Sequence, residues 1–167
     1  IEICESKYLT SEVLEADGLP VPRYALITSE DNLDQALEAV GGIFPVVLKL
    51  LSGTQGIGVS IVDSYASLKS VYQTIAKLAP ENEILIQEKI DANYDLRIQI
   101  IIKKFDPINP KEDNCVLLGS MKREAVENDF RTNYSLGGKV SGYEISDEIK
   151  DLACRAANAV GCHWCGV

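Results

Sequence analysis

A glycine-rich turn between two apolar segments is the feature that most limits what this chain can fold into. Residues 45–51 read PVVLKLL, residues 53–58 read GTQGIG, and the chain returns through VSIV at residues 59–62. Both flanking segments are short, apolar and rich in β-branched side chains, which favours strands over helices. We therefore predict a strand, a glycine loop and a second strand, an order in which the loop does not open a helix.

The composition of this turn suits phosphate. Glycine allows backbone N–H groups to approach oxygen atoms closely, and Lys49, which precedes Gly53 on the first strand, supplies a compact positive charge. A Walker loop ends in Gly-Lys-Ser/Thr and opens a helix, a dinucleotide fingerprint also opens a helix, and a kinase loop has its lysine downstream. We predict instead that Lys49 and the loop amides hold phosphate. A glycine-rich hairpin with a lysine that reaches solvent is the structural alternative.

Apolar periodicity and capping residues predict an α+β chain. An opening helix is expected to end at Gly18, and Ser29, Ser64 and Ser146 are each expected to cap a helix. The predicted strands cover residues 24–27, 45–51, 57–62, 84–87, 95–102, 116–126 and 161–167.

The second half of the chain has a different pattern from the first. From Asp95 onward a period-two segment predicts a long antiparallel hairpin, and its turn, residues 103–114, is expected to be a solvated insertion. With 167 residues and 46% apolar content, the chain can bury one core or two small lobes. We expect a lead-in helix over residues 1–21, a first lobe over 22–87 and a second lobe over 88–167.

Charge and hydropathy exclude several classes of protein. The net charge of −9 repels phosphate backbones, so general nucleic-acid binding is not expected. No apolar run approaches the roughly 18 residues of a membrane span, and no basic start followed by an apolar stretch suggests export. We expect a cytoplasmic protein that does not bind membranes. The sequence leaves the oligomeric state open, a homo-oligomer included.

The five cysteines are odd in number and irregularly spaced, which favours reduced thiols over a disulfide framework. Cys162 and Cys165 form a Cys-x-x-Cys pair, so a redox pair and half a zinc site are alternatives. However, this pair follows a predicted helix and begins a predicted strand. We therefore predict that the two thiols lie on opposite faces of that strand, and that His163 between them is structural.

Several ordered motifs resemble the RimK-type ATP-grasp glutamate ligases, over nearly the whole chain. PVVLKLLSGTQGIGV at residues 45–59 is similar to the lysine strand and glycine loop of that family, and ILIQEKI at 84–90 is similar to its adenine hinge. NDFRTN at 128–133, with LGG at 136–138, resembles its second-lobe signature. The resemblance implies an α+β ATP-grasp fold, in which two lobes with antiparallel sheets sandwich ATP.

The resemblance also implies roles for individual residues at the nucleotide. Lys7 and Lys49 correspond to two ATP-contacting lysines, and Glu88, Lys89 and Ile90 correspond to the hinge that meets adenine. The other residues expected to bind nucleotide are Gly53, Gln55, Gly56, Gly58, Asp95 at the ribose, and Thr132.

The catalytic residues that the resemblance implies are Arg123, Arg131 and Asn133. They would stabilise charge on the terminal phosphate and on an acylphosphate, which is electrostatic preorganisation rather than acid–base chemistry. Lys122 and Lys139 are weaker candidates. A surface position that serves solubility is the alternative for Arg123. We expect the loop amides and Lys49 to face the same triphosphate as Arg131.

Three of these residues have a simple structural alternative. Asp95 could form a salt bridge with Arg97 or Lys103, Glu88 could be a solvated acid at a strand end, and Lys7 could be an exposed lysine in a first helical turn.

By the resemblance, the function is that of an ATP- and Mg²⁺-dependent carboxylate–amine ligase. It would add glutamate or another amino acid to a peptide, a protein tail or a small carboxylate. The family's first magnesium ligand follows the Gly-Val pair of the last strand, so we expect the metal ligands beyond Val167, none within residues 1–167, and an inactive fragment. The alternatives are a non-catalytic nucleotide-binding regulatory module and a thiol–disulfide protein.

Overall fold

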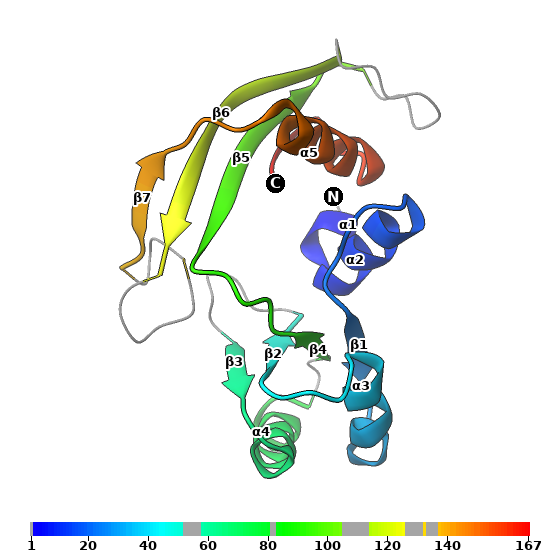
Figure 1. Cartoon of the computed structure of the whole chain (residues 1–167). Coiled ribbons are helices and arrows are strands. Elements are labelled where there is room, and N and C mark those ends of the chain that lie inside the picture. Colours follow the sequence, from blue (N-terminus) through cyan, green and yellow to red (C-terminus); the bar gives the residue numbers. More distant parts are fainter. Residues whose placement is uncertain (1, 52–57, 81–82, 105–113, 126–131, 133–136) are drawn as a thin grey trace. The chain divides into compact units, whose positions relative to one another are not determined.

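The computed structural model describes residues 2–51, 58–80, 83–104, 114–125, 132 and 137–167. The chain forms two compact units, each built around its own antiparallel sheet (Figure 1). The first unit contains Val21–Asp91 and the short segment Glu5–Tyr8. The second unit contains Ala92–Val167 and, from the N-terminal part of the chain, residues 2–4 and Leu9–Pro20.

The first unit is a four-stranded sheet in the order β1-β4-β2-β3, and all neighbouring strands are antiparallel. Its elements are β1 (Tyr24–Ile27), a 3₁₀ turn η1 (Glu30–Asn32), α3 (Leu33–Ala39), β2 (Val46–Leu50), β3 (Val59–Val62), α4 (Tyr65–Leu78) and β4 (Ile84–Glu88).

One face of this sheet packs against α3 and α4. Leu33 of α3 and Leu68 of α4 join one buried cluster with alternate residues of the strands, such as Leu48 and Ile86. The predicted cap at Ser64 is confirmed, because its hydroxyl accepts a hydrogen bond from the Ser67 backbone at 3.3 Å. Side chains that alternate with the core residues project from the opposite face of the sheet.

The second unit is a four-stranded antiparallel sheet in the order β7-β6-β5-β8. Its strands and following helix are β5 (Tyr94–Ile102), β6 (Cys115–Glu124), β7 (Lys139–Gly142), α5 (Asp147–Ala159) and β8 (Trp164–Gly166); α1 (Glu2–Glu5) and α2 (Lys7–Ala16) open the chain.

Helix α5 lies along one face of this sheet (Figure 1). Ile98, Ile100 and Ile102 of β5 pack against Ala153 and Ala157 of α5, and these small helical residues allow close approach. The predicted cap of this helix is confirmed, since the Ser146 hydroxyl accepts from the Ile149 backbone at 3.4 Å. Odd-numbered residues at the start of β5, beginning with Asp95, project from the opposite face.

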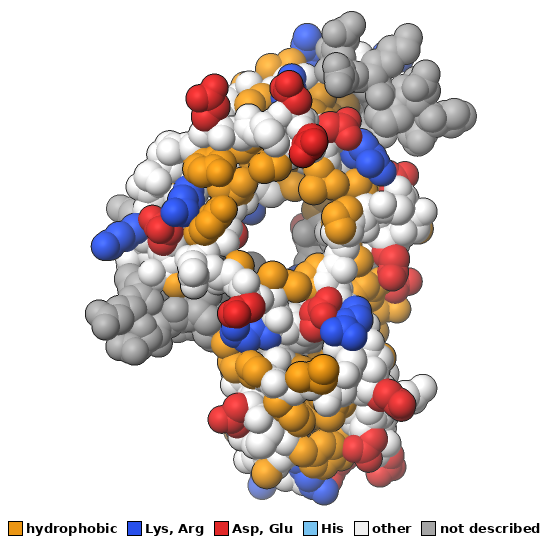
Figure 2. Space-filling view, in the orientation of Figure 1, with side chains coloured by type: hydrophobic (Ala, Val, Ile, Leu, Met, Phe, Trp, Pro, Cys, Tyr) orange, Lys and Arg blue, Asp and Glu red, His pale blue; other side chains and the backbone are white. Residues whose placement is uncertain are grey.

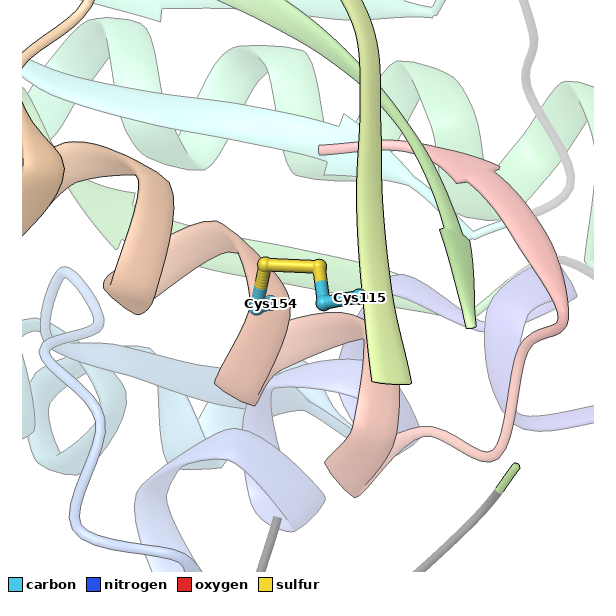
Figure 3. Close-up of a disulfide and its surroundings, with 2 residues drawn as sticks. All are labelled: Cys115 and Cys154. Carbon is cyan, nitrogen blue, oxygen red and sulfur yellow. A yellow bond between two sulfur atoms is a disulfide. The ribbon is translucent and has the colours of Figure 1, made fainter. Parts of the chain in front are cut away.

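A disulfide joins Cys115 at the start of β6 to Cys154 on α5 (Figure 3). Cys4, Cys162 and Cys165 are not disulfide-bonded. The expectation of five reduced thiols is therefore wrong for two of them. The count and spacing of cysteines in a sequence do not reveal that a strand and a helix bring two of them together. The cysteine count and spacing therefore do not show that this protein works in a reducing compartment.

Other differences from the sequence predictions are local. Strand β7 was not predicted, because KVSG is exposed along its whole length and shows no apolar alternation. Ser29 precedes a 3₁₀ turn rather than the α-helix and forms no side-chain cap bond. The last strand begins at Trp164, not at Gly161. The centre of the hairpin turn, residues 105–113, lies outside the described residues.

The surface carries mixed charge. Acidic and basic side chains lie beside one another on the face seen in Figure 2, without a large area of one sign. Within the described ranges, no helix has the length and apolar character that crossing a bilayer requires.

Candidate nucleotide-binding residues in the two units

Lys49 lies on β2, on the face of the first sheet opposite α3 and α4, and its ammonium is held by a glutamine. Its Nζ donates a hydrogen bond to Oε1 of Gln87 on the neighbouring strand β4. Burial lowers the pKa of Lys49 below its ordinary value, and the positive charge of Lys7 lowers it further. Lys49 is thus a partly desolvated cation directly before the glycine-rich turn, which is the arrangement expected of a phosphate ligand.

Lys7, the first residue of α2, binds the end of the same strand. Its Nζ donates to the carbonyl oxygens of Leu50 at 3.0 Å and Leu51 at 3.1 Å, and burial lowers its pKa. The alternative of an exposed lysine in a first helical turn is therefore wrong. Lys7 holds the backbone from which the glycine-rich turn departs, and its charge acts on Lys49.

Gly58 closes the described end of the turn. Its φ of +75° is one that side-chain-bearing residues rarely adopt, and an added Cβ would lie 2.9 Å from Leu50 Cδ1. The Leu50 N–H donates to the Gly58 carbonyl oxygen at 2.9 Å. The other predicted turn residues, Gly53, Gln55 and Gly56, lie outside the described residues.

Glu88, the predicted hinge residue, forms a close ion pair with Arg23. Its carboxylate accepts from the Arg23 backbone N–H at 2.7 Å and from Arg23 Nε at 2.8 Å, and these bonds lower the pKa of Glu88. The alternative of a solvated acid is wrong. Lys89 pairs with Asp91 at 3.1 Å, and Ile90 is 56% exposed, so the segment after β4 presents an uncovered apolar side chain.

Asp95 forms the centre of a polar cluster on the second sheet, on the face opposite α5. Its carboxylate accepts from Arg123 Nε at 2.6 Å and from Arg123 Nη2 at 2.9 Å, while Thr132 Oγ1 also donates to it. The ion-pair partner of Asp95 is therefore Arg123, not Arg97 or Lys103. The pairing follows from the strand register, which places Asp95 opposite Arg123.

The remaining predicted residues of the second unit are less informative. Arg131 and Asn133 lie outside the described residues. Lys122 pairs with Glu124 at 2.9 Å and lies 4.5 Å from the centre of the Tyr94 ring, so its charge is engaged locally. In the parts of the chain that the structure describes, no group of three His, Cys, Asp or Glu side chains could hold a metal ion.

Two residues with clear roles in these clusters were missed by the sequence analysis. Gln87 is the buried partner of Lys49, and Arg23 is the partner of Glu88. Gln87 did give a signal, because a polar residue ends an apolar strand run at residues 84–86. Arg23 gave none, since its partner is distant in sequence.

The Cys162–Cys165 pair differs from the prediction. Cys162 precedes the strand, so strand alternation does not apply to it, and its Sγ donates a hydrogen bond to the Trp164 carbonyl oxygen at 3.3 Å. Burial is the main cause that raises the pKa of Cys165 to about 11, which disfavours the thiolate needed for thiol–disulfide exchange. His163 Nδ1 lies 2.8 Å from the Ile102 carbonyl oxygen, a structural contact between neighbouring strands.

Solved structures with the same architecture are ATP-grasp ligases. The ATP-grasp ligase PsnB complexed with its minimal precursor matches 96% of this chain and 46% of its own, with a TM-score of 0.64 and 23% identity. D-alanine–D-alanine ligase from Bacillus anthracis matches 99% of this chain and 52% of its own, with a TM-score of 0.67 and 20% identity. These likenesses establish the α+β ATP-grasp fold that the motifs predicted.

The sequence defines the family more narrowly. Residues 4–167 match the RimK-like ATP-grasp domain, and the chain belongs to that family. It is 40% identical over 152 residues to a probable alpha-L-glutamate ligase of Hydrogenovibrio crunogenus, covering 90% of this chain and 45% of that protein. A protein of the same name from Picosynechococcus sp. is 36% identical over 152 residues, which again cover 90% of this chain and 45% of that protein. The chain thus spans about half the length of the curated relatives it matches.

Proposed function

We propose that this chain is the nucleotide-binding part of an ATP-dependent ligase that joins a carboxylate to an amine. Lys49 carries the proposal: it is a partly desolvated ammonium, held by a neutral amide immediately before a glycine-rich turn. A cation kept in this state is stabilised when a polyanion arrives, because burial strengthens the attraction between the two charges. The names of the curated relatives support ligation, and they support glutamate as the amino acid.

The reaction we propose has two steps. A carboxylate oxygen attacks the γ-phosphorus of ATP and ADP leaves, which gives an acylphosphate. The amine then attacks the acyl carbon, phosphate leaves with one carboxylate oxygen, and the amine loses a proton. Mg²⁺ would neutralise phosphate charge in the first step.

The described residues divide this work between binding and charge stabilisation. Lys49 and the turn would hold the phosphates, and the segment after β4 would receive the adenine. Arg123, oriented by Asp95, would stabilise negative charge that develops on the transferred phosphate. The bonds from Arg123 and Thr132 use three of the four lone pairs of the Asp95 carboxylate, so a ribose hydroxyl could use the fourth.

An isotope experiment tests this proposal. The protein as its gene encodes it would be given ATP, Mg²⁺, glutamate as the amine and a short glutamate-ending peptide with ¹⁸O-labelled carboxylates. Ligation through an acylphosphate transfers one ¹⁸O atom to the released phosphate, which mass spectrometry detects. Lys49→Met should abolish this transfer, whereas Lys77→Met, an exposed lysine on α4, should not change it.

Two other outcomes would point elsewhere. ATP binding without glutamate-dependent phosphate release would indicate the regulatory nucleotide-binding module instead of a ligase. If Cys162 and Cys165 were the functional centre, then changing both to Ser would abolish ATP binding. Under the proposed function that double variant binds ATP as the wild type does.

A further inference from the structure

Gln87 occupies a position where a polar side chain is costly. Its side chain is only 8% exposed, and among the described residues no other polar or charged side chain is buried to this extent. On β4 it follows the apolar residues Ile84, Leu85 and Ile86. Strand β4 lies between β1 and β2, so its backbone pairs with a neighbouring strand on each side. A buried amide without a hydrogen bond destabilises the fold, and an apolar side chain would avoid that cost.

The amide of Gln87 meets the ammonium of Lys49 through its oxygen. Gln87 lies opposite Val47 in the register and Lys49 lies opposite Leu85, so both side chains project from the face opposite α3 and α4. The ammonium has only donors, which means that the amide oxygen and not the NH₂ group must face it. This bond fixes the direction of Nζ, and it uses one of the three N–H donors of the lysine.

A neutral partner has a different consequence from an acidic one. In the parts of the chain that the structure describes, no carboxylate pairs with Lys49, and the charged group that acts on it is Lys7, which also carries positive charge. A glutamate at position 87 would cancel the charge of Lys49 before a ligand arrives. A glutamine favours the protonated lysine through a hydrogen bond and leaves its full positive charge for an anion.

We infer that Gln87 is a positioning residue for nucleotide binding: its amide oxygen directs the Lys49 ammonium and keeps it charged for the phosphates. This inference rests on the proposed function, because it requires that Lys49 binds phosphate. Gln87 itself acts through Lys49.

The experiment measures ATP affinity in the protein as its gene encodes it, by calorimetry with ATP and Mg²⁺, from about pH 7.5 upward, well above the phosphate pKa of about 6. Gln87→Met keeps the side-chain length and removes the acceptor. The expected result is about a tenfold weaker affinity, equivalent to about 1.4 kcal/mol. The loss of affinity at high pH should also begin at a lower pH than in the wild type.

Gln87→Glu should change the pH profile in the opposite direction. The added carboxylate stabilises the protonated lysine, so the loss of affinity should begin at a higher pH, although the affinity at pH 7.5 falls because the charge is cancelled. This variant also serves if Gln87→Met proves poorly folded. Leu85→Met, on the same strand and the same face, is the control for packing, and it should leave both affinity and profile unchanged.

A double-mutant cycle separates the two claims. In a Lys49→Met background, Gln87→Met should have no further effect on ATP affinity. If Lys49→Met binds ATP like the wild type, the proposed function fails. If Lys49→Met loses affinity but the Gln87 variants behave like Leu85→Met in affinity and pH profile, the inference about Gln87 is overturned and the proposed function stands.

Discussion

At the scale of single residues, the first unit brings the ammonium groups of Lys7 and Lys49 close enough for one charge to act on the other. Lys7 donates to the carbonyl oxygens of Leu50 and Leu51, and Lys49 donates to Gln87. The charge of Lys7 is one of the two causes that lower the pKa of Lys49, after burial. Repulsion of this kind is relieved by a bound polyanion, and it therefore links nucleotide affinity to the protonation of both lysines.

Lys7→Met should have opposite effects on affinity and on its pH dependence. ATP affinity near pH 7.5 should fall several-fold, since a positive charge and the support of two carbonyl groups are lost. The pKa of Lys49 should rise because the repelling charge is gone, so affinity should persist to higher pH than in the wild type. Calorimetric titrations across the alkaline range check both effects. A profile that moved to lower pH would contradict the coupling, and Lys77→Met provides the control for a general change in charge.

The cysteines outside the disulfide differ in reactivity for a physical reason. Burial raises the pKa of Cys165 to about 11, so near pH 8 about one thiol in a thousand is ionised, whereas Cys4 is exposed. Iodoacetamide at pH 8 should therefore modify Cys4 well before Cys165. Mass spectrometry of peptides at increasing times checks the order. Equal rates would mean that the Cys165 thiol is not protected as the structure indicates.

At the scale of elements, the link between Arg23 and Glu88 depends on a glycine. Arg23 precedes β1 and Glu88 ends β4, and their ion pair is 2.6 Å long. Gly41 follows α3 with φ +102°, and an added Cβ would lie 2.6 Å from Arg23 Cζ. The guanidinium therefore occupies the place that a side chain at position 41 would take.

Gly41→Ala should destabilise the first unit more than Gly42→Ala does. Gly42 also has a positive φ, +69°, but nothing lies within 4 Å of the place of its Cβ, so alanine there costs about 1 kcal/mol from backbone strain alone. At Gly41 the guanidinium must move as well, which weakens a partly exposed ion pair with a contribution of up to about 1 kcal/mol. Urea unfolding at pH 7 measures the difference.

The pH dependence of that difference identifies its cause. The pKa of Glu88 is lowered in the folded state, so the ion pair stabilises the fold above the unfolded pKa near 4.5, and its contribution is lost as the pH falls below that value. The extra cost of Gly41→Ala should therefore shrink on acidification. If Gly41→Ala still costs more stability than Gly42→Ala by the same amount at low pH, the cause is backbone strain and not the ion pair.

The sequence predicted elements better than it predicted partners. Strands with buried alternate residues, such as β2 and β4, and helices capped by Ser64 and Ser146 were found because local spacing reports burial and capping. Strand β7 was missed because it is an exposed edge with no apolar pattern. The contacts of predicted site residues such as Lys49 depend on registers between strands, which no local pattern encodes.

At the scale of the whole molecule, the Cys115–Cys154 disulfide closes a chain segment of 39 residues that contains strands β6 and β7 of the second sheet. Cys115 is 8% exposed and belongs to the core that α5 forms with β5. A cross-link of this span restricts the unfolded chain and stabilises the fold by about 2–4 kcal/mol. The bond therefore contributes a large share of the stability that a unit of this size can have.

Removing the disulfide should lower stability without changing the fold. Cys115→Ala together with Cys154→Ala should lower the free energy of unfolding by about 2–4 kcal/mol, and a reductant should lower the Tm of the wild type. The reductant should have no effect on the double variant, which separates loss of the bond from other effects of reduction. Cys4→Ser, at an exposed cysteine outside the disulfide, is the control and should retain the wild-type Tm. If alkylation of the unfolded, unreduced protein modified all five cysteines, the bond would be absent in solution, and any loss of stability in the double variant would come from packing alone.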